Sequence, residues 1–314
     1  MNSKTNDSLK DVFMTFLKGA GMGAADVVPG VSGGTIAFIT GIYERLLNAI
    51  RSVNIEALRV LKNQGIKALW LHIDGKFLVT VFSGLLLSAA SLAKVITYLL
   101  ENYQIYVWSF FFGLIIASFV YIVKQLDRWN KTTIFACVLG VAIAFTVTTL
   151  APSEADPQWW YYFVAGAIAI CAMILPGISG SFILLLLGMY GHVLNAVTEL
   201  NIFFVGLFIL GCGVGLMAFS RILTWLLTRF REFTLAILAG FLCGSLNLLW
   251  PWKQVLTTYT NSKGIEKPLS QVNVGPDSFQ AITGQDPQTL ICIALAFTGL
   301  ILILAIEKLT TDQQ

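Results

Sequence analysis

Six apolar stretches constrain this chain more than any other feature, because each is nearly long enough, or long enough, to cross a bilayer. They run over residues 77–99, 105–123, 132–150, 202–227, 233–250 and 288–307. A transmembrane helix needs about 20 mostly apolar residues. The charged fraction is 12%, about half that of a soluble domain. We therefore predict an all-α polytopic membrane protein and exclude a soluble enzyme, a disordered chain and a nucleic-acid-binding protein.

Two pairs of shorter apolar segments are each interrupted by a Pro-Gly break. The breaks read PGVSGG from Pro29 and PGISGS from Pro176. Proline removes a backbone donor and glycine frees the chain, so a helix stops at each break. Two half-helices around each break predict re-entrant hairpins over residues 9–50 and 159–198, with second half-helices at 34–50 and 182–198. The alternative is that both members of each pair cross the membrane fully.

The two breaks belong to an internal repeat. With a shift of 147 residues, residues 29–50 align with 176–197, and ten of these 22 positions are identical. A second, weaker alignment pairs residues 94–118 with 221–245 at a shift of 127. The difference of 20 residues corresponds to a longer basic connection in the first half, at about residues 51–76.

Each half of the chain, residues 1–150 and 151–314, then holds one hairpin and three spans. An odd number of spans turns the second half upside down relative to the first. Inverted repeats are typical of secondary transporters, whose sites form where broken helices from the two halves meet. A duplicated helix bundle without a transport role is the alternative.

The basic residues predict the orientation. If the N-terminus is cytoplasmic and each hairpin returns to its starting side, cytoplasmic regions hold 15 of the 20 Lys and Arg. The outside receives Lys253, Lys263 and Lys267, all in one long loop. Cytoplasmic loops of membrane proteins carry an excess of Lys and Arg. We therefore expect a multi-pass protein with both termini in the cytoplasm.

The breaks are the first candidates for a binding site. A helix that starts at a break has unpaired amides and a partial positive charge, which suit a phosphate or carboxylate. Small and hydroxylated residues offer such groups in both halves: Ser32, Gly33, Gly34 and Thr35, and Ser179, Gly180 and Ser181. The alternative is that these glycines only permit turns and close helix packing.

Ionisable residues at membrane depth are the second group of candidates, because burying them is costly. Lys94 and Arg221 occupy matched positions of the repeat and are predicted to attract an anion, one near each face. Snorkelling to the interface is their alternative role. Four residues are candidates for coupling or gating: Asp26, Glu44, Arg45 and His192. For Glu44 and Arg45, a local ion pair between the two is the alternative.

The sequence also lacks the motifs of most enzymes. It has no Walker loop, no CxxC and no His/Asp cluster, and its five cysteines are scattered singly. We therefore expect no catalytic residue, no metal site and no cofactor. A gradient-driven carrier fits this pattern better than an enzyme does.

The first break and its surroundings, GAGMGAADVVPGVSGGTIAFITGIYERLL, and the segment ILPGISGSFILLLLGMY in the second half resemble a family of bacterial membrane proteins. This is the PopT type, formerly a domain of unknown function and now linked to polyprenyl-phosphate transport. The resemblance implies flipping of undecaprenyl phosphate, the lipid carrier of peptidoglycan building blocks, across the bacterial cytoplasmic (inner) membrane. The phosphate head would return from the outer to the inner leaflet during recycling.

On this hypothesis the phosphate lies between the two breaks, Lys94 and Arg221 neutralise it in turn, and the prenyl tail stays in lipid through a lateral opening. A secondary transporter or channel for a small soluble anion is the alternative, and a membrane enzyme acting on lipid phosphate is a third hypothesis. An opening toward lipid, wide enough for an isoprenoid, favours the first. The expected partners are polyprenyl phosphate and membrane lipids but no nucleic acid, and both a monomer and a homodimer stay open.

Overall fold

The computed structural model describes residues 8–28, 31–150, 157–260 and 266–311; Pro29 and Gly30 of the first break lie outside them. Within these residues, six helices are long and apolar enough to cross a membrane. They confirm the six predicted stretches and are α5 (Gly75–Asn102), α6 (Gln104–Lys124), α7 (Lys131–Thr149), α11 (Ile202–Arg229), α12 (Arg231–Ser245) with the short 3-10 helix η1 (Leu246–Leu249), and α14 (Thr289–Thr311). The chain is therefore a mostly helical, multi-pass membrane protein.

Each predicted hairpin contains three helices instead of two. They are α1 (Leu9–Asp26), α2 (Gly33–Ile39) and α3 (Tyr43–Ser52) in the first, and α8 (Trp159–Ile174), α9 (Gly180–Leu186) and α10 (Tyr190–Thr198) in the second. The continuous half-helices predicted at 34–50 and 182–198 are wrong, because the chain turns again at Gly41 and Gly188. Their φ angles of +73° and +69° are left-handed values that favour glycine. At the turn that contains Gly188, the chain bends by 109° between α9 and α10.

Four helix pairs build the core. α1 packs on α5 and α8 packs on α11, whereas α6 pairs with α14 and α7 with α12. Glycines let these backbones approach closely, as small residues do in membrane proteins. A Cβ at any of eleven glycines in these pairs would collide with a carbonyl oxygen of the partner helix: Gly19, Gly23, Gly84, Gly113, Gly140, Gly166, Gly211, Gly215, Gly240, Gly244 and Gly299.

These close contacts recur at matched positions. A Cβ at Gly84 would collide with the carbonyl oxygen of Phe16, and a Cβ at Gly211 would collide with that of Phe163. The glycines differ by 127 residues and the phenylalanines by 147, which are the two shifts found in the sequence. Helices α5 and α11 also have the same length, 28 residues. At this contact, the packing of α1 with α5 has a counterpart in the packing of α8 with α11.

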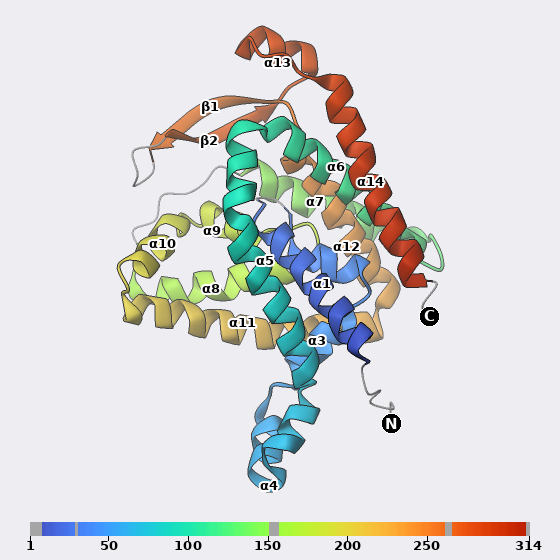
Figure 1. The fold of residues 1–314 in the computed structure, drawn as a ribbon, viewed down its shortest axis with the longest axis vertical. Helices are drawn as coiled ribbons and strands as arrows, with labels where there is room; N and C mark the ends of the chain where they lie inside the picture. Colours follow the sequence, from blue (N-terminus) through green and yellow to red (C-terminus); the bar gives the residue numbers. More distant parts are fainter. Residues whose placement is uncertain (1–7, 29–30, 151–156, 261–265, 312–314) are drawn as a thin grey trace.

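Two connections carry structure of their own. The basic connection contains α4 (Ile55–His72), and the long loop contains the antiparallel strands β1 (Lys253–Thr260) and β2 (Glu266–Asn273), followed by α13 (Pro276–Thr283). Figure 1 shows α4 at the bottom of the molecule, near the N-terminus, and the strands and α13 at the top. The two connections therefore lie at opposite ends of the molecule.

Lys253 attaches the strands to the helices. Its ammonium donates a hydrogen bond of 2.6 Å to the carbonyl oxygen of Leu248 and lies 3.7 Å from the ring centre of Trp108 on α6. Burial disfavours the charged form and lowers the pKa of Lys253 to about 7. The indole face attracts a cation, which offsets part of this cost.

Candidate functional site

The first break lies against the end of α8. The Ser32 hydroxyl donates to the carbonyl oxygen of Met173 at 2.7 Å, and the Tyr43 hydroxyl donates to that of Ile174 at 3.2 Å. Thr35 Oγ1 accepts a hydrogen bond of 3.0 Å from the amide of Gly177. The last carbonyl groups of a helix accept no hydrogen bond from within the helix. At the end of α8, residues of the first half supply the missing donors. The two halves therefore meet at their breaks.

The side chain of Asp26, the last residue of α1, lies at the start of α2. Its Oδ1 accepts a hydrogen bond of 2.6 Å from the amide of Gly33, while Oδ2 is buried and has no hydrogen-bond partner among the described residues. The amide of Gly34 donates to Ser32 Oγ at 3.0 Å, and that of Thr35 donates to the Ser32 carbonyl at 2.9 Å. The amides predicted to bind an anion thus have protein partners here, and Ser32, Gly33, Gly34 and Thr35 are all buried.

The end of the second break, Ser179 to Ser181, makes its contacts within its own hairpin. The hydroxyls of Ser179 and Ser181 lie 2.9 Å apart, and a Cβ at Gly180 would meet the Ala169 carbonyl of α8. Ser179 and Gly180 are buried, whereas Ser181 is exposed. Residues 173–177, just before this trio, are the ones that contact the first break.

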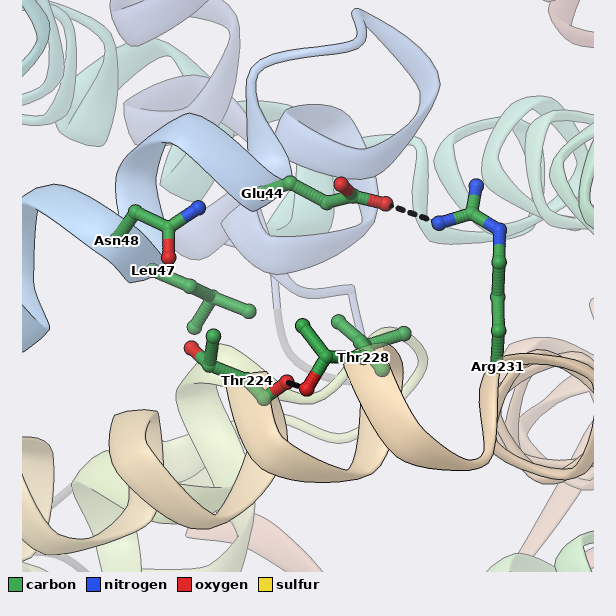
Figure 2. A pocket seen from close by; sticks show the side chains of 7 residues that line it. Glu44, Leu47, Asn48, Thr224, Thr228 and Arg231 are labelled. Carbon is green, nitrogen blue, oxygen red and sulfur yellow. Dashed lines mark hydrogen bonds and ion pairs between the residues drawn. The ribbon is translucent and has the colours of Figure 1, made fainter. Parts of the chain in front are cut away.

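A polar cavity of about 250 Å³ lies between α3 and α11. Figure 2 shows Glu44, Leu47 and Asn48 of α3 facing Thr224 and Thr228 of α11. Arg231, at the start of α12, closes one side through an ion pair of 2.6 Å with Glu44. The cavity is therefore bounded by both halves of the chain.

Glu44 and Arg45 do not form the local ion pair that was the alternative to a gating role. Glu44 pairs with Arg231 of the second half. Arg45 reaches Asp74 with two hydrogen bonds, of 2.8 and 3.2 Å, and its guanidinium lies 4.3 Å from the ring centre of Phe77. Neighbours on a helix point in different directions, so the two side chains contact different elements.

Lys94, Arg221 and His192 lie away from these contacts. Lys94 is exposed on α5 and Arg221 is exposed on α11, and neither hydrogen-bonds or ion-pairs with another residue that the structure describes. His192 is half-buried on α10. None of the three lines the cavity between α3 and α11 or the groove described next.

An apolar groove of about 340 Å³ opens between α1 and α14. Residues of α2 and α6 complete its wall. Leu17 and Leu302 on its rim are 45% and 44% exposed, so the groove reaches the outer surface of the helix bundle. Among the described residues of its lining, Lys18 is the one that carries a charge, and its ammonium donates to the carbonyl oxygen of Thr40 at 2.8 Å.

The sequence interpretation placed Lys18 with the cytoplasmic basic residues and missed this groove. Gly21, Ala24 and Ala25, one and two turns further along α1, were the available indication, because small side chains leave room on that face of the helix. A single cation beside an apolar groove can bind a lipid with an anionic head group. Within the described residues, no group of three or more His, Cys, Asp and Glu is placed to hold a metal ion.

Comparison with known proteins gives consistent matches. Residues 22–267 match the family described as VCA0040-like, undecaprenyl phosphate translocase-like. A polyprenyl-phosphate transporter of Vibrio cholerae serotype O1 is 48% identical over 294 residues, which cover 94% of this chain and 96% of the relative. A polyprenyl-phosphate transporter of Staphylococcus aureus is 35% identical over 257 residues, or 76% of this chain and 86% of the relative. Comparison with solved structures gives no significant match.

Proposed function

Because the chain belongs to the undecaprenyl phosphate translocase-like family, we propose that it moves polyprenyl phosphate, and undecaprenyl phosphate in particular, across the bacterial cytoplasmic membrane. The groove between α1 and α14 is the observation that carries this proposal. A prenyl chain needs an apolar path that is open to lipid, whereas a carrier or channel for a small soluble anion needs none. The chain acts as a transporter and not as an enzyme.

We propose that the two halves form an inverted repeat in the membrane, with both termini cytoplasmic. The matched glycine contacts and the equal lengths of α5 and α11 support a structural repeat. A helix of 28 residues is about 42 Å long, which exceeds the hydrocarbon thickness of about 30 Å and favours a tilted span. Figure 1 shows α5 and α11 running in very different directions.

The two hairpins differ in a way that fits alternating access. α3 packs against α11, whereas the matched pair, α10 and α5, makes at most a marginal contact among the described residues. Leu47 and Ile50 of α3 are 1% and 7% exposed, but their counterparts Leu194 and Val197 of α10 are 47% and 50% exposed. The structure thus supports a state closed between α3 and α11, and transport would exchange these contacts for those of α10 with α5.

In this mechanism the breaks open to admit the phosphate. Ser32, Gly33, Gly34 and Thr35 would exchange their internal partners for phosphate oxygens, and Ser179, Gly180 and Ser181 would do so in the opposite state. Lys94 and Arg221 would attract the head at the two faces. Asp26 would couple transport to protons, and Glu44, Arg45 and His192 would act in gating.

Reconstitution in liposomes tests the function. Purified protein is expected to move labelled polyprenyl phosphate between leaflets, which accessibility of the phosphate to an added phosphatase would report. Uptake of radioactive inorganic phosphate without lipid movement would favour the soluble-anion alternative. Release of inorganic phosphate from the lipid before any phosphatase is added would point to the enzyme hypothesis instead.

The ion pair between Glu44 and Arg231 provides a prediction about gating. Both side chains are about half exposed, at 56% and 48%, so the pair contributes about 0–1 kcal/mol to stability. The loss of about 1 kcal/mol is still sufficient to shift a balanced equilibrium between the closed and open states of the α3–α11 contact by about 5-fold. Glu44→Gln is therefore expected to lengthen the distance between spin labels at Asn48 and Thr228 in part of the population, with little change in melting temperature.

Asp74→Asn is the matched control, because it removes the ion pair of Arg45 on α3 with Asp74, which lies within the first half. The control is expected to leave the α3–α11 distance unchanged. An unaltered distance distribution in Glu44→Gln would remove this ion pair from the gating mechanism.

A further inference from the structure

We infer that Lys18 and the groove beside it form a docking site for polyprenyl phosphate, in which the ammonium binds the phosphate and the first isoprene units lie in the groove. This inference rests on the proposed function and names a site that differs from both breaks. Four features support it: the unsatisfied charge of Lys18, the apolar wall, the open side of the groove and its asymmetry between the halves.

Lys18 forms no ion pair with any residue that the structure describes. The Thr40 carbonyl is its recorded hydrogen-bond partner among the described residues, although an ammonium has three donors. The residue is half-buried between helices that carry apolar surfaces. Charges at membrane depth pair with opposite charges or mark a pathway. Two donors of Lys18 therefore remain for an anion supplied from outside the chain.

The rest of the groove selects an apolar occupant. Its wall comes mainly from apolar side chains of α1, α6 and α14, including Phe110 and Ile303. Gly21 and Ala24 leave the space that larger side chains would fill. An occupant must therefore be anionic at the Lys18 end and hydrocarbon along the groove, which describes a lipid monophosphate. Inorganic phosphate satisfies only the first requirement.

The site exists in one half of the chain. The position matched to Lys18 is Ala165, which is 0% exposed. Lys18 lies nine residues after Leu9, the first residue of α1, or about 14 Å along the helix. In the proposed orientation this places the ammonium in the cytoplasmic half of the membrane. We therefore assign the site to the inner-leaflet end of transport, where the lipid leaves or enters the protein.

Binding of a labelled polyprenyl phosphate to purified protein in nanodiscs tests the site. Loss of a hydrogen bond to a charged group weakens binding by about 10- to 100-fold, and we expect Lys18→Met to fall in this range. Lys18→Arg keeps the charge and is expected to stay within a few-fold of the wild type. Ala24→Trp fills the groove and is expected to weaken binding without changing any charge. Lys10→Met removes an exposed lysine of the same helix and serves as the control.

Competition experiments identify the ligand. Polyprenyl phosphate is expected to displace the label, whereas polyprenol and inorganic phosphate are each expected to compete at least about 10-fold less well because they lack one of the two parts. Equal competition by inorganic phosphate would make Lys18 a free-phosphate site and overturn the inference. Equal competition by phosphatidic acid would show that the groove does not select an isoprenoid, and would also overturn it.

The outcomes separate this inference from the proposed function. If the wild type neither binds nor moves the lipid, the proposed function fails. If the wild type does both, and folded Lys18→Met or Ala24→Trp binds as tightly as the wild type, the docking site fails and the function stands. Size-exclusion profiles establish folding. If Lys18→Met does not fold, binding by the two single variants Lys18→Arg and Ala24→Trp decides whether the docking site stands.

Discussion

Gly211→Ala is expected to destabilise the protein by about 1–3 kcal/mol, the usual cost of overpacking a well-packed interface. A Cβ at Gly211 would collide with the carbonyl oxygen of Phe163 on α8. The obstacle is backbone, which cannot turn aside as a flexible side chain can. α8 and α11 must therefore move apart, and every neighbouring contact along the pair weakens. The melting temperature in detergent measures the effect.

Gly213→Ala is the matched control, two residues along the same helix. Nothing lies within 4 Å of a Cβ at this position. Alanine favours a helix over glycine by about 1 kcal/mol at either site, so this benefit cancels when the two variants are compared. The remaining difference reports the helix contact. Gly84→Ala, at the matched position in the first half, is expected to behave like Gly211→Ala. Equal melting temperatures for the Gly211 and Gly213 variants would contradict the packing described here.

Asp26→Asn is expected to fold and bind lipid but to lose the response of transport to a proton gradient. The asparagine Oδ1 can still accept the hydrogen bond from Gly33, so the start of α2 keeps its partner. The carboxylate Oδ2 is buried without a partner among the described residues, where a charge is costly. Taking up and releasing a proton at this oxygen would link the junction of the halves to the gradient.

Asp26→Ala is expected to be worse, because it also leaves the buried Gly33 amide unpaired at a cost of about 1–3 kcal/mol. Transport into liposomes with and without an imposed pH difference measures coupling, and Glu101→Gln, at the far end of α5, is the control. Gradient-dependent transport by Asp26→Asn at the wild-type rate would leave Asp26 with a capping role alone.

Hydropathy and repetition predict much of this fold, because both act along the chain. The six long helices follow from apolar length, and the helix ends on either side of each Pro-Gly break follow from the break residues. The extra turns at Gly41 and Gly188 were indicated by identical glycines in both copies, but an apolar run alone does not show where a helix bends. The strands near Lys253 had no clear pattern of their own.

The sites were harder to predict, because they depend on contacts between distant parts of the chain. Glu44 and Arg231 are 187 residues apart, and nothing in either segment points to the other. Residues 32–35 were predicted to bind an anion from outside the chain. In the structure, Asp26 and the end of α8 are their partners instead. From the sequence, Lys18 belongs with the cytoplasmic basic residues. Its position beside an apolar groove depends on how α1 packs against distant helices.

The ion pair between the halves also has a consequence for how the energy of the transport cycle is shared. In the repeat, Glu44 corresponds to Gly191 and Arg231 to Gln104. In the proposed alternating access, the matched contact of α10 with α5 would therefore lack this ion pair. Within the proposed alternating access, the ion pair of Glu44 with Arg231 would favour the state that is closed between α3 and α11. In the proposed cycle, opening the contact between α3 and α11 would then be the harder step, and a driving force would act there.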